Sequence, residues 1–235
     1  LDADRRHWSK SRRPFASGLI SPLVGLMAAL WLIVGGLLGA LLMSPTFALV
    51  LLLYLATTLG YSFWMKRVPL LDVGVLATLY TLRLAMGAVL AHVVLSEWLL
   101  VFSLFFFLSL SLAKRHVEVL RAAEHYQGAI PGRGYRTGDS VLTLPLGLAA
   151  AMTSLLIMVI FLVFEAFPPN TYAQPHWLWA APALMFLWLS RIWLLASRGE
   201  LEDDPVSFAV RDRISIGMGI VLGFCVLIAI LPGLS

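Results

Sequence analysis

The sequence has few charged residues and almost no cysteine. Asp, Glu, Lys and Arg make up 13% of its 235 residues, against about 25% in ordinary soluble domains, whereas hydrophobic residues make up 60%. This composition excludes a soluble globular protein. The single cysteine, Cys225, lies in an apolar run, so a disulfide framework, a CxxC metal pair and a CxxC redox motif are excluded as well. The composition predicts an integral membrane protein.

Other classes are excluded by further absences. The 18 glycines and 12 prolines are scattered among apolar residues, without the polar filler of disordered or fibrous chains. The formal net charge is +4, but the basic residues lie between apolar runs and not along one face, so no nucleic-acid partner is expected. The first residues lack a signal-peptide pattern and begin with Leu1, so we expect an N-terminally truncated sequence.

Long apolar runs are what the sequence has in abundance. From Pro14 to Met65 there is no charged residue, and a helix of that length would measure about 78 Å, more than twice a hydrocarbon core of about 30 Å. The run therefore contains two helices, with the break at Ser44-Pro45. The sequence predicts an all-α, polytopic membrane bundle with seven spans, near residues 22–42, 46–64, 72–92, 96–113, 141–164, 176–196 and 213–231.

The distribution of basic residues predicts the orientation of these spans. Most of the 17 Lys and Arg residues lie in four alternate connections, whereas the connections on the other side, near residues 43–45, 93–97 and 165–175, contain none. The positive-inside rule then places the basic side in the cytoplasm. The four basic connections cover residues 1–21, 65–71, 114–140 and 197–212.

The first basic connection offers a candidate metal site. Asp2 and Asp4 are two residues apart, and a pair of carboxylates can bind one Mg²⁺ whose other ligands are water and substrate phosphates. Lys10 and Arg13 follow and could bind phosphate oxygens. The alternative is a basic flank that only anchors the first helix.

The next candidates are Tyr61, the Lys66-Arg67 pair and an arginine inside a span. Lys66 and Arg67 lie at a helix end, where snorkelling side chains are a sufficient explanation. Arg83 lies eleven residues after Asp72, or about 16 Å along a helix, which places it near the middle of the membrane. A charge there faces either a polar cavity or backbone carbonyls that accept its hydrogen bonds.

The third connection is the richest in charge. Lys114 and Glu118 are spaced as an i,i+4 pair, so the helix is expected to continue past the membrane surface. The following segment, residues 128–139, contains four glycines and two arginines, which can present N–H groups and guanidinium to a phosphate. The alternative is a flexible solvated turn.

The fourth connection contains four acids in five positions, residues 200–204. They could bind a cation. We favour helix capping, because the Asp204-Pro205 pair precedes an apolar period.

Together these segments resemble the UbiA superfamily of intramembrane prenyltransferases over nearly the whole chain. Members have nine helices, with an aspartate-rich motif after the second. Asp4-Arg5 resembles the end of that motif and Asp2 one of its variable positions, while its earlier Asn and Asp residues are absent. Seven spans agree with a bundle that lacks its first two helices. The resemblance implies one transmembrane domain over residues 1–235, incomplete at its N-terminus.

Two further stretches refine the resemblance. Tyr61 and Lys66-Arg67 are similar to the family's Tyr/Lys signature, with a spacing one residue longer. Where ordinary members carry a second aspartate-rich box, this sequence has Lys114-Arg115-x-x-Glu118 and the loop 132–135. That exchange of acids for bases resembles the branch containing decaprenyl-phosphate phosphoribosyltransferase. In that branch polyprenyl phosphate is the acceptor and phosphoribosyl diphosphate the donor, and basic residues suit a donor with two phosphate groups.

The resemblance implies a Mg²⁺-dependent transferase that displaces diphosphate at the cytoplasmic face of a bacterial inner membrane. Its partners would be a polyprenyl lipid, a diphosphate-bearing donor and membrane lipid; the sequence carries no signal for an oligomeric state. Asp4, with Asp2, would hold the metal. Glu118 and Asp139 would contact ribose hydroxyls or a second metal. The catalytic candidates are Asp4, Lys66, Arg83, Lys114 and Glu118. The substrate-binding candidates are Lys10, Arg13, Tyr61, Arg67, Arg115, Arg133, Tyr135 and Asp139.

Two alternatives remain open from the sequence. Ordinary family chemistry would ionise a prenyl diphosphate for attack by an aromatic acceptor. A secondary transporter could use Arg83 at a midplane substrate site, although such proteins have an inverted repeat and several midplane polar groups.

Overall fold

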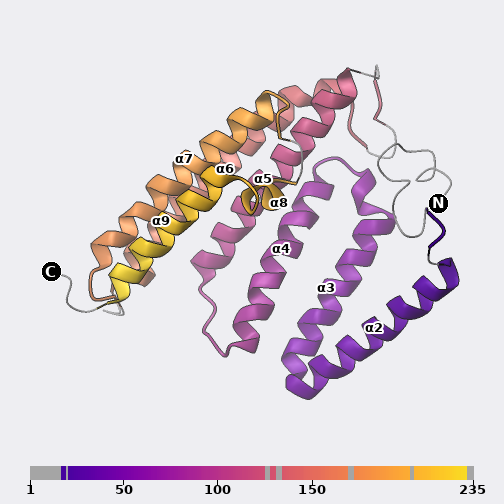
Figure 1. Cartoon of the computed structure of the whole chain (residues 1–235), viewed down its shortest axis with the longest axis horizontal. Helices are drawn as coiled ribbons and strands as arrows, with labels where there is room; N and C mark the ends of the chain where they lie inside the picture. Colours follow the sequence, from indigo (N-terminus) through magenta and orange to yellow (C-terminus); the bar gives the residue numbers. More distant parts are fainter. Residues whose placement is uncertain are drawn as a thin grey trace. The chain divides into compact units, whose positions relative to one another are not determined.

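The computed structural model describes residues 17–19, 21–124, 128–130, 134–168, 172–201 and 204–231. Over these residues the chain is helical, and its β content is limited to an isolated bridge between Ala129 and Arg136. The predicted all-α class is confirmed (Figure 1).

Seven helices in the described part of the chain are long and apolar enough to cross a membrane. The number confirms the count made from the apolar runs. These helices are α2 (Pro22–Met43), α3 (Pro45–Phe63), α4 (Leu71–Leu90), α5 (Glu97–Ala123), α6 (Ser140–Phe161), α7 (Ala180–Ser197) and α9 (Arg213–Ile230). Short helical segments lie between them: η2 (Met65–Arg67), η3 (Thr137–Asp139), η4 (Leu162–Ala166), η5 (Pro175–Trp179) and α8 (Pro205–Ala209).

Local chemistry explains where these helices begin and end. α2 ends at Met43 and α3 begins at Pro45, so the expected break at Ser44-Pro45 is confirmed. Asp212 caps α9 by accepting a hydrogen bond from the backbone N–H of Ser215. α5 runs to Ala123, beyond the span expected to end at residue 113, which confirms that this helix continues past the apolar run.

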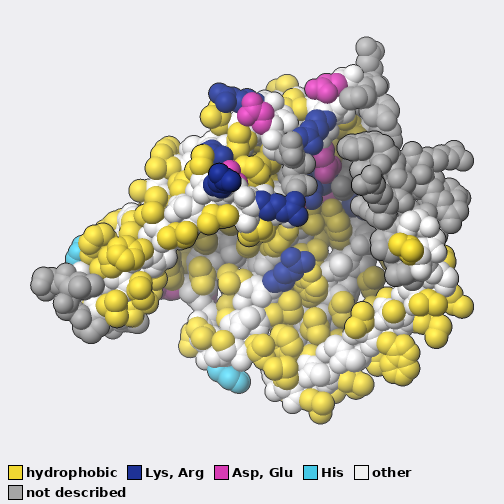
Figure 2. Space-filling model, in the orientation of Figure 1, with side chains coloured by type: hydrophobic (Ala, Val, Ile, Leu, Met, Phe, Trp, Pro, Cys, Tyr) yellow, Lys and Arg dark blue, Asp and Glu magenta, His cyan; other side chains and the backbone are white. Residues whose placement is uncertain are grey.

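The chain divides into two compact units, Leu1–Leu53 and Tyr54–Ser235. In the first unit α2 has one buried residue, Ala40. The second unit contains the core, where α5 packs most extensively against α6 and then against α4. On the face drawn in Figure 2 hydrophobic side chains cover far more of the surface than charged ones, as expected where helices face lipid.

A buried polar contact joins three helices of this core. Ser109 of α5 donates a hydrogen bond to the carbonyl oxygen of Gly147 in α6, at 2.9 Å, and accepts one from the indole N–H of Trp193 in α7, also at 2.9 Å. A Cβ at Gly147 would overlap the Trp193 ring. Glycine is therefore required here so that α6 and the indole can approach closely.

Three of the basic connections meet at one end of the second unit. The guanidinium of Arg121, near the end of α5, donates hydrogen bonds to the carbonyl oxygens of Gly199 and Leu201, at 3.1 and 2.9 Å. Tyr135, before α6, donates to Asp72 at the start of α4. The described residues of the connections 65–71, 114–140 and 197–212 are thus brought together, as alternating spans require. Most of the first connection, residues 1–16 and 20, lies outside the described residues.

Candidate functional site

A cavity of 260 Å³ opens where these connections meet. Its wall combines cationic, carboxylate and phenolic groups with apolar side chains from α3, α4, α5 and α8. Two other cavities between helices of this unit, of 210 and 190 Å³, have mainly apolar walls. The lining residues of the charged cavity are Tyr61, Leu76, Tyr80, Leu110, Ser111, Lys114, Arg115, Asp204, Pro205 and Val206.

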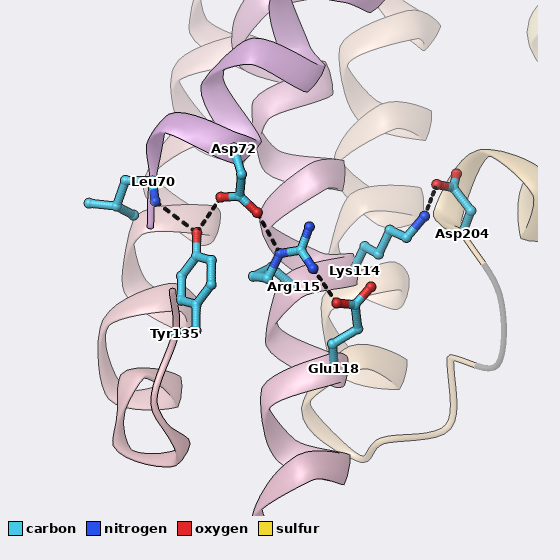
Figure 3. A network of polar contacts seen from close by, with 7 residues as sticks. All are labelled: Leu70, Asp72, Lys114, Arg115, Glu118, Tyr135 and Asp204. Atoms are coloured by element: carbon cyan, nitrogen blue, oxygen red, sulfur yellow. Dashed lines mark hydrogen bonds and ion pairs between the residues drawn. The ribbon is translucent and has the colours of Figure 1, made fainter. Parts of the chain in front are cut away.

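Arg115 is held between two carboxylates at the cavity wall (Figure 3). Its Nε lies 2.9 Å from Oδ2 of Asp72, and its Nη1 contacts a carboxylate oxygen of Glu118. The Arg115 side chain is 1% exposed and that of Asp72 is 0% exposed. Because a buried charge is costly unless it is paired, these contacts offset the burial of the guanidinium and fix its position.

Tyr135 links this ion pair to the start of α4. Its hydroxyl donates to Oδ1 of Asp72 at 2.7 Å and accepts from the backbone N–H of Leu70 at 2.9 Å. Its ring faces the guanidinium of Arg115, with 5.7 Å between Cζ and the ring centre. Burial, together with the hydrogen bond to Asp72, raises the pKa of the Tyr135 hydroxyl, which therefore stays protonated at physiological pH.

The loop that carries Tyr135 is packed tightly against the turn before α4. A Cβ at Gly134 would overlap the carbonyl oxygen of Arg67 and the ring of Pro69. Leu70 has a φ of 64°, in the left-handed region that is unfavourable for a residue with a Cβ. The N–H of this strained residue bonds to the hydroxyl of Tyr135. Strained backbone persists only where surrounding contacts hold it, so the packing of the loop against the turn determines the conformation of Leu70.

Lys114 pairs with the segment between α7 and α9. Its Nζ lies 2.8 Å from Oδ2 of Asp204, whereas the sequence suggested pairing with Glu118, which contacts Arg115 instead. Oδ1 of Asp204 accepts a hydrogen bond from the backbone N–H of Val206 at 3.0 Å. Asp204 is therefore the N-cap of α8, which confirms the capping interpretation, and it also lines the cavity.

Arg83 adopts neither of the two arrangements expected from the sequence. Its Nε and Nη2 donate to the hydroxyl of Tyr54, with an Nε to oxygen distance of 3.0 Å, and not to backbone carbonyls. Its Cζ lies 4.9 Å from the ring centre of Tyr80 and 5.4 Å from that of Tyr54. Tyr80 lines the cavity, but Arg83 does not. The cation is stabilised by two aromatic faces beside the cavity.

The remaining candidates are placed as follows. Tyr61 lines the cavity, half-buried Lys66 and exposed Arg67 lie in η2, and Asp139 accepts a hydrogen bond from the backbone N–H of Arg136 at 2.8 Å. That bond gives Asp139 a local role in shaping the loop before α6. The candidates that lie outside the described residues are Asp2, Asp4, Lys10, Arg13 and Arg133.

The described residues do not supply a complete metal site. They contain no group of three or more His, Cys, Asp or Glu side chains arranged to hold a metal ion. Asp72, Glu118 and Asp204 each contact a cationic side chain. Because these carboxylates neutralise Arg115 and Lys114, they do not fit a Mg²⁺ site.

Asp72 is the residue that the sequence interpretation missed. In the sequence, Asp72 serves only to locate Arg83 along its helix. In the structure Asp72 is the fully buried partner of Arg115 and Tyr135. A usable signal was present: an acid in the first turn of an apolar span, close to the membrane boundary, needs a cationic partner. The second role of Asp204, at the cavity wall, was also missed.

Comparison with known proteins identifies relatives of this chain. It is 49% identical over 222 residues to the y4nM protein of Sinorhizobium fredii, an alignment that covers 94% of this chain and 43% of that protein. It is 29% identical over 225 residues to the nodulation protein NoeC of Azorhizobium caulinodans, with 94% and 72% of the two chains covered. It is 27% identical over 215 residues to the decaprenyl-phosphate phosphoribosyltransferase of Mycobacterium tuberculosis, with 91% and 68% covered.

The chain thus spans less than half of the y4nM protein. The model of the UbiA prenyltransferase family matches residues 1–216, which is most of the sequence and includes every segment that forms the charged cavity. This match confirms the resemblance drawn from the aspartate and tyrosine motifs, and it agrees with the seven long apolar helices of the described residues. The chain belongs to the UbiA prenyltransferase family.

Proposed function

We propose that this chain is a membrane transferase that transfers a phosphoribosyl group from a diphosphate donor to a polyprenyl phosphate. The observation that carries the proposal is the cavity with Lys114 and Arg115 in its wall, at the end of the bundle where the basic connections meet. Cationic side chains beside apolar ones suit a substrate with phosphate groups and a lipid chain. The relatives named decaprenyl-phosphate phosphoribosyltransferase support this choice within the family.

In the proposed reaction a phosphate oxygen of the lipid bonds to the anomeric carbon of the ribose. The bond from that carbon to diphosphate breaks, and diphosphate leaves with the electron pair. Negative charge builds on the departing oxygens, and the proposal assigns its neutralisation to Lys114 and Arg115, which line the cavity. Arg115 is held rigidly by Asp72 and Glu118, so its position need not be reorganised during the reaction.

The proposal also includes Mg²⁺, bound by Asp4 with Asp2, and a cytoplasmic active face in a bacterial inner membrane. If Asp4 is a ligand, its replacement by Ala in the full-length protein abolishes turnover, and excess Mg²⁺ does not restore it. A fully active D4A variant would remove Asp4 from the site.

The test of the transfer reaction uses purified full-length protein in detergent with radiolabelled phosphoribosyl diphosphate and polyprenyl phosphate. We expect labelled lipid from the wild type, at least about tenfold less from K114Q because one charge contact to the leaving group is lost, and near-normal amounts from D212N. Absence of labelled lipid, with activity on a prenyl diphosphate and an aromatic acceptor, would favour ordinary family chemistry instead.

A further inference from the structure

The two cations in the cavity wall are held in different ways. Arg115 is 1% exposed and is fixed by Asp72, which is 0% exposed, and by Glu118. Lys114 is 35% exposed and its partner Asp204 is 27% exposed. A solvated pair of this kind is weak and easily exchanged, whereas a buried pair is costly to break. Lys114 is therefore the cation that can change partners.

The charges around the cavity also bear on how an anion can enter. Among the described residues Asp204 contacts Lys114, while Asp72 and Glu118 contact Arg115. An incoming phosphate group adds further negative charge to this group. Because Oδ2 of Asp204 lies 2.8 Å from Nζ of Lys114, a phosphate oxygen that binds Nζ meets a like charge there unless this carboxylate moves away.

Asp204 is built so that it can move without loss of its local structure. Its Oδ2 contacts Nζ of Lys114 at 2.8 Å, while its Oδ1 accepts the capping hydrogen bond from Val206 at 3.0 Å. The two interactions use different oxygen atoms of the carboxylate. Figure 3 draws the one with Lys114. The ion pair can break while the cap on α8 remains.

We propose that Asp204 is a specificity-determining residue that competes with the anionic substrate for Lys114. When no anion is bound, Asp204 neutralises Lys114; a phosphate or diphosphate group that enters the cavity displaces the carboxylate and takes its place on Nζ. Anions with too little charge to displace Asp204 are thereby rejected. This inference rests on the proposed function, because it assumes that the cavity binds a phosphorylated substrate.

The test measures the affinity of the full-length protein in detergent for inorganic diphosphate, by titration calorimetry. D204N is the informative variant, because Asn retains the capping oxygen and removes the charge. We expect the Kd to fall at least about threefold, and this gain to shrink in high salt, because an exposed charge is removed. In the double variant D204N/K114Q the gain disappears, because it depends on Lys114.

The matched control is D212N. Asp212 also caps a helix and pairs with a basic residue, Arg191, at 2.7 and 3.0 Å, but it does not line the cavity. Its replacement should leave the affinity for diphosphate unchanged. An equal gain in D204N and D212N would overturn the proposal, because the effect would then come from overall charge.

The remaining outcomes separate this inference from the proposed function. If the wild type binds diphosphate, K114Q binds it more weakly and D204N equals the wild type, the competition is disproved and the substrate class stands. If neither the wild type nor D204N binds, both proposals fail.

A second titration, with farnesyl phosphate, identifies the source of the phosphate group. If D204N gains affinity for diphosphate alone, Lys114 binds the soluble donor. If it gains affinity for farnesyl phosphate alone, Lys114 binds the lipid.

Discussion

At the scale of single residues, the hydroxyl of Tyr135 is the group on which several contacts depend. It is bonded on one side to the carboxylate of Asp72 and on the other to the backbone N–H of Leu70. These bonds join the loop before α6 to the first turn of α4. The loop therefore fixes the carboxylate that in turn fixes Arg115 at the cavity.

Replacing Tyr135 by Phe removes both hydrogen bonds and retains the ring beside Arg115. We expect Y135F to lower the free energy of unfolding by about 1–3 kcal/mol, because a buried acceptor and a buried N–H lose their partner. Denaturation in mixed detergent measures this change. The control is Y61F, because Tyr61 lines the cavity and its hydroxyl makes no hydrogen bond to a described residue; an equal loss in Y61F would contradict the role of Tyr135.

The same residue predicts a pH dependence. The pKa of Tyr135 is raised in the folded protein above its ordinary value of 10.0, so the unfolded chain loses this proton at a lower pH than the folded one. The contribution of Tyr135 to stability is thus fully present below pH 10 and is lost as the pH rises through the folded-state pKa. The difference in unfolding midpoint between wild type and Y135F should shrink above about pH 10 and stay constant between pH 7 and 9.

Asp72 and Arg115 predict a larger effect. In D72N the amide group would place a donor against Nε of Arg115 and leave the guanidinium with Glu118 alone among the carboxylates that contact it in the described residues. We expect a loss of about 3 kcal/mol or more, since breaking a buried pair leaves an uncompensated charge. D212N, whose pair with Arg191 is partly exposed, should cost about 1 kcal/mol or less. Equal losses in the two variants, measured by the same denaturation assay, would contradict the importance of burial.

At the scale of elements, the contact between α6 and α7 depends on one glycine. G147A would force a methyl group into the Trp193 ring and disturb the hydrogen bonds of Ser109. We expect a loss of about 2 kcal/mol or more, because overpacking strains a well-packed core. Gly39 lies in α2, and a methyl group added there meets no atom of another segment within 4 Å. The stability of G39A should therefore equal that of the wild type or exceed it slightly. Comparison of the two variants by thermal aggregation in detergent tests the role of this close approach.

Elements were predictable from the sequence to different degrees. The spans followed from apolar runs, the end of α2 from Ser44-Pro45 and the start of α8 from Asp204-Pro205, because these signals act over a few residues. The pairing of charges was not predictable, because Tyr135 and Asp72 are 63 residues apart and Lys114 and Asp204 are 90 apart. The charges on α5 suggested a pair between Lys114 and Glu118, whereas helix packing brings Asp204 to Lys114 and Asp72 to Arg115, and Glu118 contacts Arg115.

At the scale of the whole molecule, the orientation in the membrane stays a prediction that single cysteines can test. Cys225 is buried and can be replaced by Ser to give a background without cysteine. Glu200 lies in a basic connection and Ala173 in a connection of the other side, and both are exposed. A membrane-impermeant maleimide added outside intact cells should label the A173C variant and not E200C, with the reverse in inverted vesicles. Labelling of both variants from one side would contradict the alternating path.

The left-handed backbone at Leu70 has a consequence for how the loop could be monitored. The N–H of Leu70 donates to the hydroxyl of Tyr135, which lies 65 residues later in the loop before α6. Detachment of that loop would let the backbone at Leu70 relax and the first turn of α4 fray. Amide deuterium uptake at residues 70–74 therefore measures how often the loop before α6 detaches from α4. Y135F should accelerate this uptake and leave uptake in the middle of α6 unchanged.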